Sequence, residues 1–100
     1  MSDITYVLEK DVGLISFYQS RPDPDLVKDL LELCCLQAKE CDIRFYVIPC
    51  STVIGKILLF YKAFCQEKGK ELRILCANQG VLSYIKMLRI DQLIKVGLME

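Results

Sequence analysis

The stretch that decides the fold runs from Ile43 to Cys76 and reads IRFYVIPCSTVIGKILLFYKAFCQEKGKELRILC. Its first residues, Ile43 to Ile48, would place apolar side chains on both faces of a strand, which is typical of a strand in a parallel sheet. From about Ser51 to Lys68 the apolar residues recur at helical spacing, and Gly69 suits the end of a helix. Leu72 to Cys76 forms a second short apolar run. Strand, helix and strand in this order predict parallel strands joined by a helix.

The segment before this stretch predicts a hairpin followed by a helix. Ile4 to Lys10 and Leu14 to Gln19 are rich in β-branched and aromatic residues, and Asp11 to Gly13 separates them with residues that suit a tight connection. Asp23 to Asp25 then supplies an N-cap, a proline in the first helical position and an acidic first turn. This helix is expected to run to about Glu40.

The segment after it predicts one more helix and one more strand. Asn78 is placed to cap a helix, and Leu93 to Val96 forms the last apolar run. The element order is therefore β-β-α-β-α-β-α-β. We expect an α/β fold with a mixed, mostly parallel sheet covered by helices, formed by one domain over residues 1–100.

Composition narrows the range of functions. The 100 residues carry 13 basic and 13 acidic side chains, and 53% are apolar, so the chain is expected to fold as one domain with a substantial core. Because the basic residues are scattered, nucleic acid is not an expected partner. No apolar run approaches the length of a membrane span, and the first four residues do not resemble a signal peptide. A cytoplasmic protein without membrane insertion is expected.

The chain has no histidine, which removes the residue most often used as a general base near neutral pH. A non-enzymatic protein is therefore expected, with no catalytic residue, no metal site and no cofactor. Gly55-Lys56 brings to mind a phosphate-binding loop, but Cys50 stands where that motif has its first glycine and Ile57 follows the lysine. Nucleotide binding by this route is excluded.

The six cysteines lie mostly at apolar positions of predicted helices and strands, and none forms a Cys-x-x-Cys pair. Free, mostly buried thiols are therefore expected rather than a disulfide framework or a zinc site. These residues are Cys34, Cys35, Cys41, Cys50, Cys65 and Cys76.

The last third of the chain carries a spacing found in a known family. Gly69 to Ile74, followed by apolar residues at regular intervals, fits the pattern G-G-x-L-x-L-x-x-x-x-x-x-V-x-x-x-L-x-x-x-G-L-x-x-L-x-x-I with one extra residue near Lys68. With the element order, this resembles the STAS domain of bacterial anti-sigma factor antagonists and of the cytoplasmic tails of sulfate transporters. The later matching positions are Val81, Ile85, Ile90, Leu93 and Val96, and Arg89 stands where the pattern has its final glycine.

The resemblance implies a functional site at the start of the central helix. The family's D-S-S-G-L-type sequence falls on Cys50 to Gly55, so Ser51 is the first candidate for phosphorylation by a partner kinase and Thr52 the second. The implied function is regulation of transcription in bacterial signalling. The implied partner is an anti-sigma factor or similar serine kinase, or another STAS-type protein, and a homodimer is an open alternative. Cys50 replaces the family's aspartate and Val53 its glycine.

Three alternatives stay open for this site. Ser51 or Thr52 is an ordinary N-cap in the first, and in the second the domain is a scaffold or a self-associating module without phosphorylation. In the third, Cys50 is a reactive thiol of a redox sensor. Apolar residues in excess of one buried stripe predict a partner surface on the same helix, although neighbouring helices could also cover them. The candidate contact residues are Cys50, Val53, Lys56, Leu59, Phe60 and Ala63.

Overall fold

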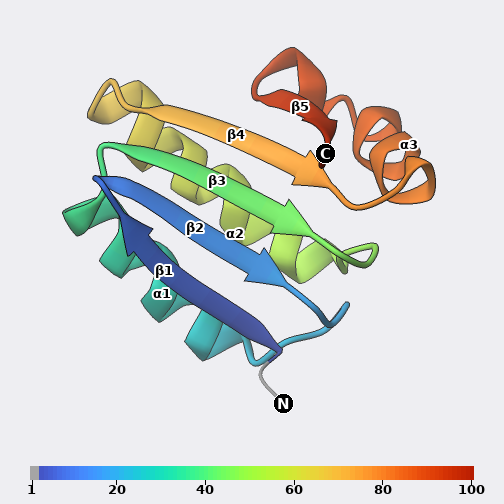
Figure 1. The fold of residues 1–100 in the computed structure, drawn as a ribbon, viewed down its shortest axis with the longest axis horizontal. Helices are drawn as coiled ribbons and strands as arrows, with labels where there is room; N and C mark the ends of the chain where they lie inside the picture. The colour runs from blue at the N-terminus through green and yellow to red at the C-terminus, as the bar shows by residue number, and fades with distance from the viewer. Residues whose placement is uncertain (1–2) are drawn as a thin grey trace.

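The computed structural model describes residues 3–100 and has the predicted element order, so the α/β fold is confirmed (Figure 1). Two short irregular helical segments, Lys62–Glu67 and Ile90–Gln92, complete it. The elements are β1 (Ile4–Glu9), β2 (Val12–Phe17), α1 (Pro24–Gln37), β3 (Glu40–Phe45), α2 (Ser51–Tyr61), β4 (Glu71–Cys76), α3 (Gln79–Met87) and β5 (Lys95–Leu98).

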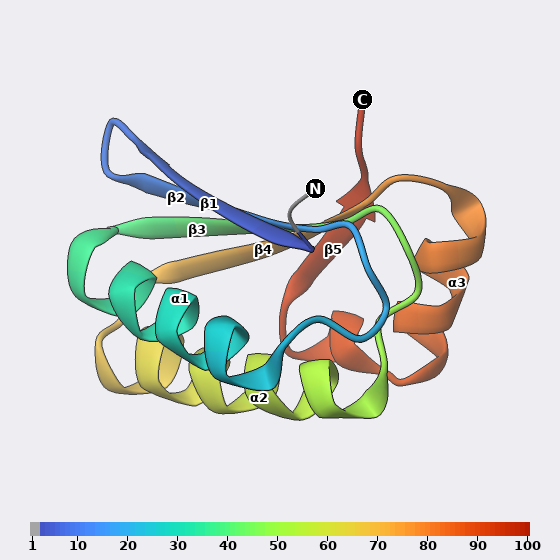
Figure 2. The same ribbon diagram turned by 90° about the horizontal axis from the view of Figure 1, so that it is seen from below.

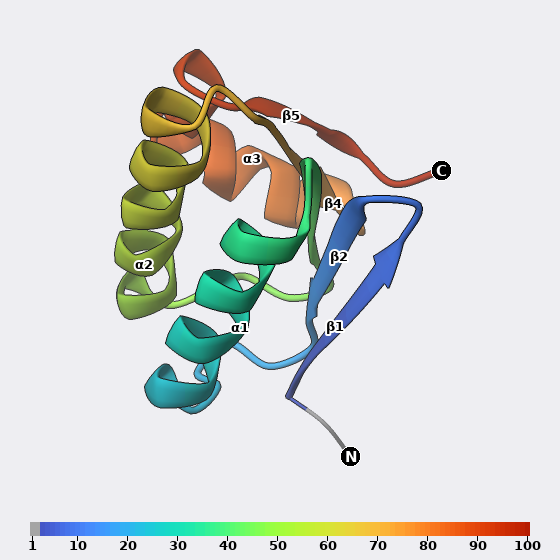
Figure 3. The ribbon, with the colours of Figure 1, turned by 90° about the vertical axis from the view of Figure 1, so that its left-hand side faces the viewer.

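The five strands form one sheet in the order β1-β2-β3-β4-β5. β1 pairs with β2 antiparallel, and the other neighbours are parallel, so the predicted mixed sheet is confirmed. Each helix connects one parallel strand to the next strand along the sheet. Because such connections are right-handed and all proceed in the same direction across the sheet, their helices lie on one face. α1 and α2 lie against that face and α3 lies beside them near β5 (Figures 2 and 3). Within residues 3–100, no helix lies over the opposite face, which we call the open face.

The core lies between the sheet and the helices. Alternate strand residues point into it, and Ile15, Ile43 and Ile74 occupy one register row across β2, β3 and β4. Phe17 and Phe45, two residues after Ile15 and Ile43, form the next inward-facing pair, and their ring centroids lie 5.1 Å apart. The prediction that the strand after α1 is apolar on both faces was wrong, because the residues between these core positions are largely polar and face outward.

Local capping chemistry confirmed two predicted helix starts. The Asp23 carboxylate accepts a hydrogen bond from the Asp25 amide at 3.0 Å, and the Asn78 side chain accepts one from the Val81 amide at 3.0 Å. Gly69, with φ of 67°, follows the helical region as expected. α1 is shorter than predicted and ends at Gln37.

The hairpin turn begins one residue earlier than predicted and is one residue shorter. Lys10 and Asp11 form it, with φ of 48° and 70°, because a two-residue hairpin loop of this kind needs left-handed backbone at both positions. Val12 and Gly13 already belong to β2. Gly13 is needed there for space, since a Cβ at this position would lie 2.5 Å from the Sγ of Cys34 on α1.

The predicted helix from Ser51 to Lys68 is divided into two parts. An α-helix covers Ser51–Tyr61, and a π-helical segment, with a wider turn, covers Lys62–Glu67. The rings of Phe60 and Phe64 stack across this junction with centroids 4.8 Å apart, and both side chains are buried.

Candidate functional site

Hydrogen bonds between two loops fix the start of α2. The amide of Cys50 donates to the carbonyl of Ser20 at 3.0 Å, and the Oγ of Ser20 donates to the carbonyl of Ile48 at 2.6 Å. The loop that follows β2 is thereby joined to the loop that follows β3. The buried side chain of Pro49 lies next to this junction in the chain. The first turn of α2 is therefore held at the carboxyl-terminal edge of the sheet, where loops of α/β proteins commonly form binding sites.

The two predicted phosphorylation candidates occupy the first two positions of α2 and are exposed. The N-cap is Cys50, whose side chain makes no capping hydrogen bond. The alternative in which Ser51 or Thr52 is an ordinary N-cap is therefore wrong, because neither residue occupies that position. Both residues are exposed at a helix start that has no side-chain cap.

The electrostatics of this turn favour an anion. The amides of Ser51, Thr52 and Val53 precede the first intrahelical hydrogen bond, which joins the Ile54 amide to the Cys50 carbonyl at 3.2 Å. No acidic residue lies in the first turn of α2. The helix dipole places partial positive charge at the same point, so a phosphate on the Ser51 hydroxyl would be stabilised without a nearby repelling carboxylate from α2.

A groove runs between α1 and α2 and brings four of the predicted contact residues together. It has a volume of about 450 Å³, and Leu59 at its edge is 71% exposed. Lys28 and Glu32 form an exposed pair 4.0 Å apart on the α1 side. The lining residues from the α2 side are Lys56, Leu59, Phe60 and Ala63, and those from α1 are Lys28, Leu31, Glu32 and Cys35.

The predicted exposure of two contact residues was wrong. Val53 is 2% exposed and Phe60 5% exposed, because the core face of α2 includes them. Val53 is thus buried in the core, and Phe60 lines the groove from inside. Leu58, about one helical turn after the buried Ile54, is exposed.

The predicted site therefore has two parts on one helix. Cys50, half-buried, lies beside the hydroxyl pair at the first turn, whereas the groove begins further along α2. Ser51 and Leu59 are eight residues apart, which corresponds to about 12 Å along a helix axis. One protein partner could contact both parts, since an interface of ordinary size covers about 800 Å² on each side and is thus roughly 30 Å across.

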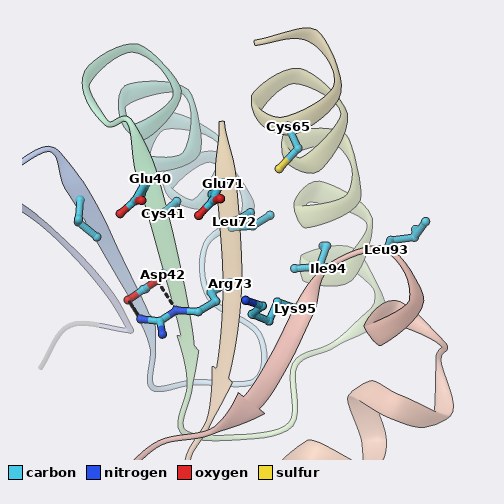
Figure 4. Close-up of a pocket in the computed structure, with 11 residues that line it drawn as sticks. Glu40, Cys41, Asp42, Cys65, Glu71, Leu72, Arg73, Leu93, Ile94 and Lys95 are labelled. Atoms are coloured by element: carbon cyan, nitrogen blue, oxygen red, sulfur yellow. Dashed lines mark hydrogen bonds and ion pairs between the residues drawn. The ribbon is translucent and has the colours of Figure 1, made fainter. Parts of the chain in front are cut away.

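A second hollow, which the sequence did not predict, lies at the amino-terminal ends of β3, β4 and β5 (Figure 4). It has a volume of about 550 Å³ and places Glu40 and Glu71, register partners on β3 and β4, side by side. Asp42 is buried, but both of its oxygens accept hydrogen bonds from Arg73, at 3.0 and 2.7 Å. The hollow thus has no free buried carboxylate for acid-base work. Asp42 and Arg73 are 31 positions apart in the sequence, so no local pattern predicted this pair.

All six cysteines are free, and burial is less general than expected, since only Cys34, Cys41 and Cys76 are buried. Two main effects raise the pKa of the Cys41 thiol. The larger is its hydrogen bond with Cys34, and the smaller is its burial. No group of three or more residues suited to a metal ion occurs within residues 3–100. The redox role for Cys50 stays a prediction.

Comparisons with known proteins assign no family and no function to this site. No protein-family model matches the sequence, and a search of curated proteins gives no match. In the part of the chain that the structure describes, no helix has the length and apolar character needed to cross a membrane.

Proposed function

We propose that the protein is a non-enzymatic regulatory module of the STAS type whose contact with a protein partner is controlled by phosphorylation of Ser51, with Thr52 as a second acceptor. The exposed hydroxyl pair at an uncapped helix start carries this proposal. A partner kinase supplies the ATP and the catalytic groups, and the chain supplies the acceptor.

The backbone at Arg89 supports the STAS resemblance. Arg89 has φ of 62°, a left-handed conformation that favours glycine, and it occupies the position where the family pattern has its final glycine. The backbone after α3 thus has the left-handed conformation that a glycine at this position would favour, although the residue is an arginine. The loop joining α3 to Ile90–Gln92 is thus consistent with the family pattern.

The switch works through charge at the edge of a partner surface. A phosphate adds about −1.5 to −2 charges to a chain whose formal net charge is zero. A partner that covers the first turn of α2 and places an apolar side chain in the groove beside Leu59 would have to desolvate this phosphate. Phosphorylation is therefore expected to weaken binding of such a partner. The partner is an anti-sigma factor or similar kinase, or another STAS-type protein.

Phosphate mapping tests the acceptor. The protein is incubated with ATP and a lysate of the cells that produce it, repurified, and analysed by intact-mass spectrometry and fragmentation. We expect one added phosphate on Ser51 or Thr52, and none on the doubly substituted Ser51→Ala, Thr52→Ala protein. Ser83→Ala is the matched control, because Ser83 is an exposed serine on α3, and it should be phosphorylated as the parent is. Absence of phosphate, or phosphate retained in the double variant, would contradict the switch.

The exposed Leu59 favours a second candidate, a scaffold or self-associating module without phosphorylation. A leucine with 71% exposure beside an apolar groove suits a contact that needs no charge change. Leu59→Asp and Ser51→Asp separate the two functions in a binding or sedimentation assay. If Leu59→Asp abolishes association and Ser51→Asp does not, the scaffold is favoured. If each of the two single variants abolishes association, the switch is favoured.

A further inference from the structure

The open face of the sheet carries a hollow that the proposed function does not use. Its volume is about 420 Å³, within the range of pockets that hold small organic ligands. It lies over the carboxyl-terminal halves of β3 and β4 and the end of β5, on the face turned toward the viewer in Figure 1. The lining residues are Arg44, Tyr46, Arg73, Leu75, Leu98, Met99 and Glu100.

Arg44 is the cation of this hollow that lacks an acceptor. Its Nε is buried and has no hydrogen-bond partner within residues 3–100. Its neighbours in the sheet register are Ser16 on β2 and Leu75 on β4, neither of which carries a charge. The Nε is shielded from the hollow, but Arg44 as a whole is half-buried and lines it, and no hydrogen bond or ion pair joins its guanidinium to a described residue. A ligand would therefore reach the guanidinium at its terminal nitrogens, where a charged acceptor is favourable.

The second arginine is already occupied. Arg73 donates from Nε and Nη2 to the two oxygens of Asp42, a bidentate pair that neutralises its charge. Glu100 is exposed, and no ion pair within 4.0 Å joins it to a described residue. One unpaired guanidinium therefore faces the hollow, and it matches a single negative charge better than a doubly charged phosphate.

The remaining lining adds a smaller apolar part to a hollow whose exposed surface is mainly polar. Leu75 and Met99 are half-buried, Leu98 is exposed, and together they supply aliphatic surface from β4 and the end of β5. Tyr46 is exposed and stacks on Tyr18 with ring centroids 4.8 Å apart, so its ring is held in place. A fixed aromatic ring beside an arginine offers contact area with little loss of side-chain entropy.

We propose that this hollow binds a small organic monocarboxylate, with the carboxylate on the Arg44 guanidinium and an apolar body against Leu75, Leu98 and Met99. The planar guanidinium fits a carboxylate through parallel hydrogen bonds. α2 lies against the other face of the sheet, so this site stands apart from phosphorylation at Ser51 and does not depend on it.

A probe pair tests the charge requirement on the unaltered protein. 4-Phenylbutyrate and its neutral amide are titrated to about 10 mM into ¹⁵N-labelled protein, a range that detects millimolar dissociation constants. We expect the carboxylate to shift the Arg44 Nε–H signal and the backbone amide of Leu98, and the neutral amide to bind about tenfold more weakly. Equal binding of both probes, no shifts, or shifts confined to the groove between α1 and α2 would each overturn the proposal.

Three substitutions separate Arg44 from general charge effects. Arg44→Gln should weaken 4-phenylbutyrate about tenfold, while Arg21→Gln, which removes an exposed arginine from the loop before α1, should leave the affinity unchanged. Glu100→Gln should raise the affinity about twofold to threefold, because it removes a negative charge from the lining. If Arg44→Gln fails to fold, the probe pair and the Glu100→Gln protein still test the site. Unchanged affinity in Glu100→Gln, together with equal binding of the two probes, contradicts it.

Discussion

Replacement of Gly13 by alanine is expected to destabilise the fold through one steric contact. A Cβ at Gly13 would lie 2.5 Å from Cys34 Sγ and 3.2 Å from both Ala38 Cβ and Tyr6 Cε1. Non-bonded atoms of this size normally lie about 3.5–4 Å apart, so the sulfur would have to move by about 1 Å. Cys34 is 0% exposed and packed against β2, which leaves it little room.

The magnitude follows from two opposing effects. Overpacking a core position costs about 1–3 kcal/mol. The substitution also restricts the unfolded chain, which returns about 0.4–1 kcal/mol, because Gly13 does not have a positive φ and alanine fits its backbone. The free energy of unfolding should therefore fall by about 1–2 kcal/mol. Urea denaturation followed by circular dichroism measures it as a lower midpoint with an unchanged slope.

A double-mutant cycle with Cys34→Ala isolates the contact. Cys34→Ala alone should cost about 1–2 kcal/mol through the lost sulfur contacts. In the double variant the new Cβ at position 13 occupies part of the space that the sulfur vacates, so the combined loss should be about 1 kcal/mol smaller than the sum. Additive losses would show that the Cys34 sulfur is not the obstacle, and a more stable Gly13→Ala protein would refute the reasoning altogether.

Three further predictions concern backbone strain, an ion pair and pH. Arg89→Gly should raise the free energy of unfolding by up to about 1 kcal/mol, measured as a higher urea midpoint, because it relieves a left-handed non-glycine residue. Asp42→Asn should lower it by about 1–3 kcal/mol, because both Asp42 oxygens bind Arg73; an unchanged midpoint would count against this pair. Burial raises the pKa of the Cys76 thiol, so stability is full below the unfolded pKa of about 8.5 and falls as pH rises toward the folded pKa. In reducing buffer, Cys76→Ala should make the urea midpoint less dependent on pH between about 8 and 10, and an equal slope in both proteins would contradict this.

Local signals predicted the elements but not their exact limits. Asp23 and Asn78 marked helix starts correctly because an N-cap acts on amides two or three residues away, within reach of the sequence pattern. The hairpin turn was misplaced because Lys10 is an unusual residue for a left-handed position, whereas Gly13 looked like a turn residue and is a packing residue. Its partner Cys34 is 21 positions away in the sequence, and no local rule identifies that contact.

The start of the helix that carries the candidate site was predicted correctly, but the outward-facing side of that helix was not. The start of α2 at Ser51 was predicted correctly, because Pro49 lies two residues before it and the helical spacing of apolar residues begins after it. The buried face of α2 was assigned incorrectly because apolar residues surround most of this helix, so the spacing does not single out one stripe. Packing against α1 and the sheet decides that Phe60 points inward and Leu59 outward, and this is settled by the tertiary structure alone.

The open face follows from charges that alternate with the core residues. In β3 the inward positions Cys41, Ile43 and Phe45 are buried, and the residues between them are Asp42 and Arg44. A second layer of helices over this face would bury these charges at a cost of several kcal/mol each unless it brought partners for them. Asp42 finds its partner within the sheet, in Arg73, whereas Arg44 does not. A molecule that covers Arg44 therefore incurs a desolvation cost unless it supplies an acceptor, which makes that residue the first position to test.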